Sequence, residues 1–278
     1  MSPRACVIGD PIAHSRSPLI HRYWLAQHDI AGSYERQHIT AAALPAFIAE
    51  LRAGGWRGCN VTVPHKGAVA AQVDELTPVA ARLGAANTLW LEEGRLRADN
   101  TDVAGFMDNL DQAAPGWRAR AGAATVLGAG GAARAAVHGL LERGVGTVHV
   151  VNRSVERATQ LAQAFGPRVR PAAWDKVGNA LAGSGLLVNT TSLGMSGQPS
   201  LALDLSPLPA GATVYDIVYV PLETPLLAQA RARDLEVVDG LGMLLHQAVP
   251  GFERWFGVRP EVTKELRDLL VADIEGTR

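Results

Sequence analysis

The chain contains very little cysteine and has no excess charge of either sign. Its 278 residues include two cysteines, Cys6 and Cys59, each in or beside an apolar segment. We expect these thiols to be buried rather than joined in a disulfide or a metal site. Lysine and arginine total 26, aspartate and glutamate total 27, and the formal net charge is −1. This balance argues against nucleic acid or an anionic membrane as a partner.

Long apolar runs are also missing. No segment reaches the roughly 20 apolar residues that a transmembrane helix needs, and the first residues lack the apolar core of a signal peptide. We therefore expect a cytoplasmic protein with no membrane partner. The sequence has no HExxH, no paired CxxC and no nucleophile elbow. A metal site or an acyl-enzyme mechanism has no support, and we expect no metal.

Strand-like and helix-like segments alternate along the first hundred residues, which is typical of an α/β fold. Strands are expected at 6–9, 34–39 and 58–62, and helices at 17–29, 40–53 and from about 65. Ser17 followed by Pro18 predicts a helix N-cap with proline at the first helical position. Glu93 and Gly94 predict a hairpin turn within 88–97, which adds an antiparallel element.

A second series of elements follows and predicts a doubly wound parallel sheet. A helix is expected at 102–110, with strands near 124–127, 148–152, 186–189, 214–218 and 236–239. Two further helices are expected at 241–255 and from 260 to the end. We expect this tail to pack on the first domain. The predicted domains are a substrate-binding α/β domain, 1–101 plus 240–278, and a Rossmann-type domain, 102–239, with a cleft between them.

The segment around Gly128 has the order strand, glycine turn, helix, strand that a dinucleotide-binding unit needs. Gly128 permits a tight turn, and Gly130 lets the backbone approach a pyrophosphate. Ala133 is small enough for the helix to pack on the sheet. The pyrophosphate would lie at the helix N-terminus, where free N–H groups and the helix dipole favour an anion. Such a loop can also be an ordinary strand-to-helix turn.

The end of the next strand indicates which dinucleotide is bound. A protein that selects NAD usually has an acidic residue there for the ribose 2′-hydroxyl. This chain has Asn152 and Arg153, with Arg157 one helical turn later. Arginines can pair with a 2′-phosphate. The alternative is that they are only solvated charges, but cations at a helix N-terminus oppose the helix dipole. We therefore predict NADP(H) as the cofactor.

Polar side chains gather at element ends in the first domain. Ser15 and Ser17 follow the first strand, Thr62 and Lys66 follow the strand at 58–62, and two further groups are Asn87 and Asp102. Most have an ordinary alternative: Ser17 as an N-cap, Lys66 as a solvated lysine, and the Asn and Asp as turn formers. The N-cap alternative leaves Ser15 unexplained. Together they suit a polyhydroxylated ring, with a Lys–Asp pair to supply the proton that accompanies hydride transfer to a ketone.

Nine motifs in order resemble those of the shikimate dehydrogenase family, from Gly9 to Gln247. They are GDPIAHSRSP (9–18), NVTVPHK (60–66), GAANT (84–88), NTD (100–102), GAGGAAR (128–134), NRS (152–154), NTTSLGM (189–195), DIVYVP (216–221) and GLGMLLHQ (240–247). The resemblance implies an NADP-dependent oxidoreductase of aromatic amino-acid biosynthesis that interconverts 3-dehydroshikimate and shikimate.

The resemblance also implies roles for individual residues. Lys66 and Asp102 would form the catalytic acid/base pair. Substrate contacts are implied for Ser15, Ser17, Thr62, Asn87, Tyr219 and Gln247. Cofactor contacts are implied for Gly128, Ala129, Gly130, Gly131, Ala132, Asn152, Arg153, Arg157, Thr190, Ser192, Gly240 and Met243.

The sequence departs from the family pattern at His21-Arg22, where the family often has His-Asn. We expect that position to be peripheral. Two alternatives stay open: a quinate/shikimate dehydrogenase of relaxed specificity, and a non-catalytic NADP-sensing protein. The Lys66–Asp102 pair argues against a sensor. We expect a monomer or a homodimer whose partner is its small-molecule substrate.

Overall fold

A computed structural model describes residues 2–276 of the chain, which form two compact units. The first unit comprises Met1–Asp102 and Gln247–Asp273, and the second comprises Val103–His246 and Ile274–Arg278. Each unit is built on its own six-stranded sheet. The chain therefore leaves the first unit after Asp102 and comes back to it at Gln247.

The return to the first unit lies at Gln247 rather than at 240, because α11 (Leu241–His246) belongs to the second unit. Gly242 of α11 lies against Asn109 of α5 (Asp102–Ala113), and an added Cβ would be 1.8 Å from the Asn109 carboxamide oxygen. The Asn109 Nδ2 also donates to the Asp239 carbonyl at 2.8 Å. These contacts hold the segment before Gln247 on the second unit.

The sheet of the first unit has the order β2-β1-β3-β5-β6-β4. Its strands are β1 (Arg4–Gly9), β2 (Ser33–His38), β3 (Gly58–Val61), β4 (Glu75–Leu76), β5 (Thr88–Glu92) and β6 (Arg95–Asp99). β1 pairs in parallel with β2 and β3, while β5 is antiparallel to β3 and β6. The turn residues Glu93 and Gly94 have φ of 51° and 74°, as a two-residue hairpin requires. The predicted hairpin is confirmed.

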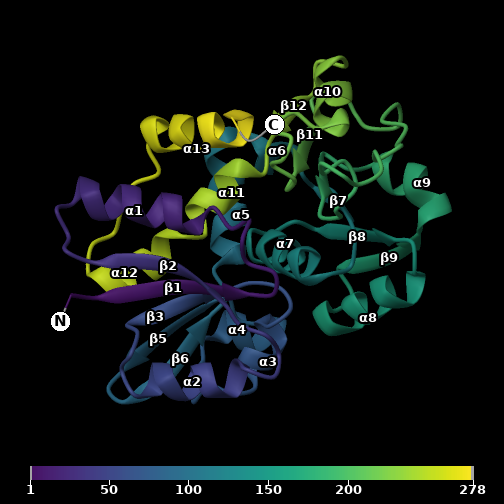
Figure 1. Ribbon diagram of the computed structural model, residues 1–278. Coiled ribbons are helices and arrows are strands. Elements are labelled where there is room, and N and C mark those ends of the chain that lie inside the picture. Colours follow the sequence, from purple (N-terminus) through teal and green to yellow (C-terminus); the bar gives the residue numbers. More distant parts are fainter. Residues whose placement is uncertain (1, 277–278) are drawn as a thin grey trace. The chain divides into compact units, whose positions relative to one another are not determined.

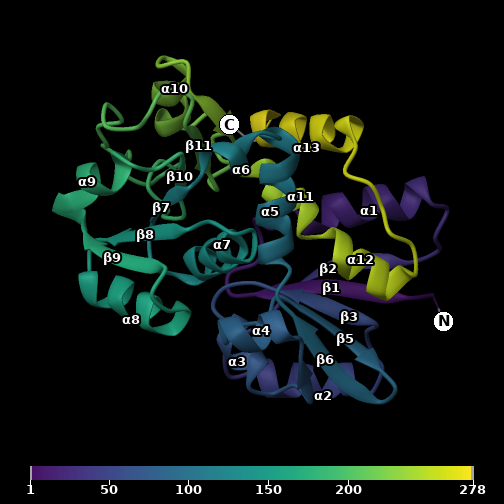
Figure 2. The same cartoon turned by 180° about the vertical axis from the view of Figure 1, so that it is seen from behind.

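Helices cover both faces of this sheet (Figure 1). One face packs against α2 (Leu44–Arg52), α3 (Lys66–Ala70) and α4 (Pro78–Leu83), and the other against α1 (Ser17–Gln27) and α12 (Val249–Phe256), as the reverse view also shows (Figure 2). Leu51 and Val69 are fully buried in the first of these layers. The apolar burial that stabilises the unit is thus divided between two helical layers.

The layer formed by α1 and α12 is aromatic. The His21 ring stacks on Tyr34 with 3.9 Å between centroids and 7° between planes, and Phe252 lies 5.9 Å away. His21 is fully buried, and within residues 2–276 neither ring nitrogen has a hydrogen-bond partner. Burial lowers the pKa of His21 from 6.5 to about 3, because an imidazolium would lose its hydration there.

The C-terminal part of the first unit is fastened to the sheet by Trp255. Its Nε1 donates to the Leu89 carbonyl at 2.9 Å. An added Cβ on Gly58 would lie 2.1 Å from that same nitrogen, so only glycine leaves room for the indole. The final helix α13 (Lys264–Gly276) is linked to α1 by an ion pair of 2.8 Å between Arg16 and Asp273.

The sheet of the second unit is entirely parallel, with the order β12-β11-β10-β7-β8-β9. Its strands are β7 (Ala123–Leu127), β8 (Thr147–Asn152), β9 (Val169–Ala173), β10 (Leu186–Asn189), β11 (Thr213–Asp216) and β12 (Glu236–Val238). The strand order reverses between β7 and β10, so the carboxyl ends of these two strands mark the ligand-binding position of a doubly wound sheet. The predicted fold class is confirmed.

Helices connect these parallel strands. They are α7 (Gly131–Glu142), α8 (Val155–Phe165), α9 (Val177–Leu181) and α10 (Pro225–Arg231), with shorter elements α6 (Trp117–Arg120) and η1 (Trp174–Lys176). Ala133, on the face of α7 that meets the sheet, is fully buried, as its small side chain predicts. β4 and β9 were not predicted from the sequence.

Several predicted helix limits were wrong. The N-cap position of α1 is Arg16 and not Ser17. The helix expected from Thr40 begins at Leu44, because Thr40 instead closes a preceding turn with Ala43.

The C-terminal helix limits also differ. The helix expected at 241–255 is two helices, with Pro250, which has no N–H, in the first turn of α12. The helix expected from 260 begins at Lys264, where the Thr263 hydroxyl accepts from the Leu266 N–H. Residues 277–278 lie outside the described range.

The two cysteines are buried, as predicted, and occupy paired positions on the neighbouring strands β1 and β3. Burial raises the pKa of the Cys6 thiol, so it behaves as a small apolar side chain. In the described part of the chain, no helix combines the length and apolarity that crossing a membrane requires.

The buried neutral His21 predicts loss of stability in acid. The unfolded chain binds a proton below pH 6.5, whereas the folded chain does so only near pH 3. The free energy of unfolding should therefore fall by about 1.4 kcal/mol per pH unit between these limits. Denaturant unfolding of His21→Phe from pH 7 to pH 4 should show a shallower slope. The exposed control His28→Gln should keep the wild-type slope, and equal slopes for all three proteins would refute the assignment.

Candidate active site

The segments that follow β1 and β3 leave the sheet at the same edge, because the two strands are parallel neighbours. The Thr62 N–H donates to the Ile8 carbonyl at 2.9 Å. An added Cβ on Gly9 would lie 2.6 Å from the Thr62 methyl carbon. This close approach brings the loop that holds Ser15 and Ser17 to the same edge as Thr62.

Lys66 is the first residue of α3, and its backbone is held from two sides. The preceding His65 is buried and hydrogen-bonds through Nε2 to the Ile39 carbonyl at 2.6 Å. The Ala86 N–H donates to the Lys66 carbonyl at 2.9 Å. The lysine therefore starts from a fixed backbone even though α3 is short.

Lys66 and Asp102 form an ion pair. Lys66 Nζ lies 2.5 Å from Asp102 Oδ2, and the two side chains are 28% and 14% exposed. Asp102 is the first residue of α5, where a carboxylate is favoured by the helix dipole. Its backbone N–H donates to the Asn100 carboxamide oxygen at 3.2 Å. The partial burial of both side chains restricts their motion, and the part that stays exposed to solvent can contact a ligand.

Asn87 fixes the second carboxylate oxygen of Asp102. Its Nδ2 donates to Asp102 Oδ1 at 2.8 Å, while its Oδ1 accepts from the Thr101 N–H at 2.8 Å. The backbone N–H can only donate, so the carboxamide orientation is determined. Each oxygen of Asp102 thus has a donor, one cationic and one neutral.

Gln247 reaches the same group of residues through its backbone. The Thr101 hydroxyl donates to the Gln247 carbonyl at 2.8 Å. Thr101 is next to Asp102 and Gln247 begins the return to the first unit, so this bond joins the two places where the chain changes unit. Lys66, Asn87, Asp102 and Gln247 are therefore brought together by the fold.

The two serines lie at the start of α1. Ser17 is 7% exposed, and its N–H donates to the Ser15 hydroxyl at 3.4 Å. The Ser15 carbonyl accepts from Arg36 Nε at 2.8 Å, which ties this loop to β2. Since α1 has no side-chain cap bond, capping does not explain the serine at position 17.

In the second unit, the glycine turn lies at the carboxyl end of β7, beside β10. Gly128 has φ of +105°, and an added Cβ would lie 2.7 Å from the Thr190 hydroxyl oxygen. Thr190 donates to the Leu127 carbonyl at 2.6 Å, so its hydroxyl supports the turn. At Gly130 and Gly131 an added Cβ would meet nothing within 4 Å. Open space therefore lies over the first N–H groups of α7, at Gly131, Ala132 and Ala133, which have no partner within the helix.

Asn189 and Asp216 connect the loops that follow β10 and β11. Asn189 Nδ2 donates to Asp216 Oδ1 at 2.9 Å, and the Thr224 hydroxyl donates to Oδ2 at 2.7 Å. The Val218 N–H adds a third bond at 3.1 Å. Burial raises the pKa of Asp216 against the effect of these donors. The side chains thus hold in place the loops that bear Ser192 and Tyr219.

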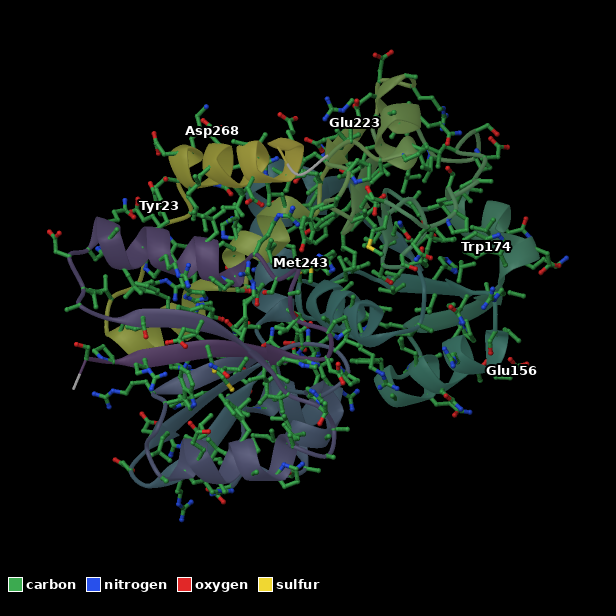
Figure 3. The ribbon with its side chains drawn as sticks, in the orientation of Figure 1. Tyr23, Glu156, Trp174, Glu223, Met243 and Asp268 are labelled. Carbon is green, nitrogen blue, oxygen red and sulfur yellow. The ribbon has the colours of Figure 1, made fainter. Side chains whose placement is uncertain are left out.

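The three residues predicted to bind a 2′-phosphate lie at the end of β8 and the start of α8. Asn152 Nδ2 donates to the Ser154 carbonyl at 2.8 Å. Arg153 and Arg157 are exposed and form no ion pair with any residue in the range 2–276. Glu156, labelled in Figure 3, lies between them in sequence but accepts from the Ser154 hydroxyl at 2.7 Å. Both guanidinium groups are available to an external anion.

The remaining predicted residues lie on the second unit. Gly240 permits a close approach of backbones, since an added Cβ would be 2.0 Å from the Ile217 carbonyl oxygen. Met243, labelled in Figure 3, is half-buried on α11. Ser192 and Tyr219 are on the loops held by Asn189 and Asp216. Ala129 is half-buried within the glycine turn. The ligand contacts of Gly240, Met243 and Tyr219 remain predictions.

Sequence reasoning missed the supporting polar residues. Thr88, Thr101 and His65 are at most 2% exposed and bind the site residues or their backbones. All three lie inside the motifs at 84–88, 100–102 and 60–66, so their place in a motif could have indicated a supporting role. Tyr34, which donates to Asn60 at 2.6 Å, lies in none of the motifs.

Models of three protein domains match this chain. They are the shikimate dehydrogenase substrate binding domain at residues 7–89, shikimate / quinate 5-dehydrogenase at 114–195, and the shikimate 5′-dehydrogenase C-terminal domain at 240–264. The shikimate dehydrogenase (NADP(+)) of Methylobacterium radiotolerans is 62% identical over 279 residues, with 99% of each chain covered. The chain belongs to the shikimate dehydrogenase family.

Solved structures of the family share the fold. Shikimate 5-dehydrogenase from Thermus thermophilus in complex with NADP(H) and shikimate has a TM-score of 0.86 at 37% identity, covering 98% of this chain and 99% of its own. Quinate dehydrogenase from Corynebacterium glutamicum in complex with NAD has a TM-score of 0.89 at 31% identity, covering 97% and 99%. The two-unit α/β fold is therefore that of the family.

The two glycines of the turn should separate stability from cofactor binding. Gly128→Ala places a Cβ at an unfavourable φ and against Thr190, so its Tm should fall by several degrees. Gly130→Ala should keep the wild-type Tm, because its Cβ meets nothing within 4 Å. It should weaken NADPH binding if the pyrophosphate lies over Gly130 as predicted, because the Cβ would enter that space. Calorimetry and fluorescence titration with NADPH measure the two effects. Similar Tm values for both variants would contradict this division.

Proposed function

We propose that the chain is an NADP-dependent oxidoreductase that interconverts 3-dehydroshikimate and shikimate, a step that leads to chorismate and the aromatic amino acids. The main observation is the Lys66–Asp102 ion pair in the unit that the family model describes as substrate binding. Relatives 56–62% identical over nearly the full chain, such as those of Methylobacterium radiotolerans and Azorhizobium caulinodans, are named shikimate dehydrogenase (NADP(+)). The geometry of the pair supports that chemistry.

Lys66 acts as the proton donor in the reducing direction. As hydride reaches the C3 carbonyl carbon of the substrate, negative charge develops on the carbonyl oxygen, and the Lys66 ammonium delivers a proton to it. In the oxidising direction Lys66 takes that proton from the C3 hydroxyl. Asp102 orients the ammonium through the 2.5 Å contact and accepts from a substrate hydroxyl. Asn87 keeps the carboxylate in that orientation.

The other polar residues of the first unit bind the substrate. Ser15 and Ser17 donate to the carboxylate, and Thr62 and Gln247 contact the carboxylate or the ring hydroxyls. Tyr219 is assigned to the substrate carboxylate only because its motif resembles that of the family. For Ser15, Ser17 and Thr62 the support is their position after the neighbouring strands β1 and β3, together with the lack of a capping role for Ser17.

The residues of the second unit fit NADP(H). The open space over Gly130 and Gly131 and the first N–H groups of α7 suit a pyrophosphate, and two unpaired arginines suit a 2′-phosphate. NADP⁺ supplies the hydride acceptor when bound. Thr190 and Ser192 follow β10 and would lie beside the cofactor, and Gly240 and Met243 would face the nicotinamide.

A quinate/shikimate dehydrogenase of relaxed specificity is the second candidate. Quinate dehydrogenase from Corynebacterium glutamicum, in complex with NAD, has the same fold at a TM-score of 0.89. The absence of an acidic residue at 152–154 favours NADP over NAD. We further propose that the enzyme acts in the cytoplasm. We also propose that it is a monomer or a homodimer, and light scattering would distinguish the two by their molar mass.

Lys66→Ala should lower kcat for shikimate oxidation with NADP⁺ by about 100-fold or more, with a smaller change in KM, because a general acid/base is lost. Initial rates measured by NADPH absorbance test this. Lys264→Ala is the matched control, since it removes another Lys–Asp pair of 2.5 Å from an exposed surface, and it should keep wild-type kcat. Near-normal turnover of Lys66→Ala would reassign the proton donor.

Arg153→Ala and Arg157→Ala should each raise KM for NADP⁺ roughly tenfold and leave KM for NAD⁺ unchanged, because only NADP⁺ has the 2′-phosphate. Arg170→Ala, on the exposed surface of β9 in the same unit, should change neither constant. An equal loss with both cofactors would show that the arginines do not read the 2′-phosphate.

A further inference from the structure

A line of buried hydrogen bonds runs from Tyr34 to the Lys66–Asp102 pair. Its members all belong to the first unit and are Tyr34, Asn60, Thr88, Asn87 and Asp102. The four residues before Asp102 in this line are at most 4% exposed. Buried polar groups cost free energy unless each is satisfied, and linked groups can strengthen one another.

The carboxamide of Asn60 has one possible orientation. Its Nδ2 donates to the Asn87 carbonyl and to the Thr88 hydroxyl oxygen, each at 3.2 Å. A backbone carbonyl only accepts, so the nitrogen must face it. Asn60 Oδ1 must then accept, and the Tyr34 hydroxyl donates to it at 2.6 Å. The single proton of Tyr34 is therefore committed to Asn60.

The line continues in the same donor direction to Asp102. The Thr88 hydroxyl donates to Asn87 Oδ1 at 3.0 Å, where the Thr101 N–H also donates. With its oxygen occupied, Asn87 presents its nitrogen to Asp102 Oδ1 at 2.8 Å. The orientation of Asn60 is thus transmitted through Thr88 and Asn87 to the carboxylate that faces Lys66.

We propose that Tyr34 is a positioning residue that acts through Asn60, Thr88 and Asn87 to hold Asp102 against Lys66. This rests on the proposed function, since it requires the Lys66–Asp102 pair to carry out the reaction. Tyr34 is fully buried, and its ring is fixed by the stack on His21 at 3.9 Å. Its hydroxyl therefore keeps one direction, toward Asn60.

Tyr34→Phe tests the proposal because it removes only the hydroxyl and keeps the ring stack. We expect kcat for shikimate oxidation to fall roughly tenfold while KM for NADP⁺ stays within about twofold, since the second unit is untouched. The matched control is Tyr215→Phe. Tyr215 is also fully buried, stacks on Phe106 at 4.8 Å and accepts a hydrogen bond from Asn109 at 2.8 Å. Within residues 2–276 this bond continues to the Asp239 carbonyl and not to Asp102. Tyr215→Phe should lose Tm like Tyr34→Phe and retain kcat.

A double-mutant cycle separates positioning from a merely structural effect. If Tyr34 acts through Asn87, then Tyr34→Phe should reduce kcat by less than about twofold in an Asn87→Ala background, because the path is already broken. Thr88→Val interrupts the same path with a side chain of similar shape, and should reproduce the kcat loss even where Tyr34→Phe fails to fold.

Three results would overturn the inference. They are wild-type kcat in Tyr34→Phe or Thr88→Val, an equal kcat loss in Tyr215→Phe, and fully additive losses in the cycle with Asn87→Ala. Failure of the proposed function is distinguishable, because then the wild-type enzyme itself would not oxidise shikimate with NADP⁺, and the role of Tyr34 would fall with it.

Discussion

The carboxamide of Asn87 is the contact on which the first unit's chemistry depends. Its oxygen accepts a hydrogen bond from the Thr101 N–H, and its nitrogen donates one to Asp102 Oδ1. One planar group therefore binds the backbone just before α5 and orients the carboxylate beside Lys66. Asn87 lies just before β5, and Asp102 follows β6. The antiparallel hairpin brings both to one edge of the sheet, where the parallel strand β3 also ends. An all-parallel sheet would have sent one of the three to the opposite edge.

The second unit depends on a close approach of backbones rather than on charge. Gly128 and Thr190 meet where the strand order reverses, and Asn189 and Asp216 tie together the next two loops. Three neutral donors surround the buried Asp216 carboxylate, so the loops are held without a counter-ion. Arg153 and Arg157, the two cations predicted to bind the 2′-phosphate, take no part in the hydrogen bonds around Asp216. Support and ligand binding are thus assigned to different residues.

The sequence predicted the elements that are set locally. The glycine turn, the hairpin at Glu93 and Gly94 and the parallel sheet follow from periodicity and turn chemistry, and each is confirmed. The polar residues at element ends were predicted as a set, and the structure brings Lys66, Asn87, Asp102 and Gln247 together.

What could not be predicted depends on contacts between residues far apart in sequence. Ser17 has the local features of an N-cap, but it is the first residue of α1, is buried and makes no side-chain cap bond. Tyr34 and Asn60 are 26 residues apart, and nothing near Tyr34 signals a hydrogen bond to that partner. The return at Gln247 is set by how closely Gly242 fits Asn109, which no single-residue propensity contains.

The fastening of Trp255 to Leu89 has a consequence for the order of folding during synthesis. The first unit joins the beginning of the chain to residues that are translated almost last, and its aromatic layer is open until α12 closes over His21 and Tyr34. All six strands of the second unit precede α12 in the sequence. On the ribosome the sheet of the second unit can therefore form before the first unit is closed. The first unit must then wait with an exposed apolar face, a vulnerable state that chaperones recognise.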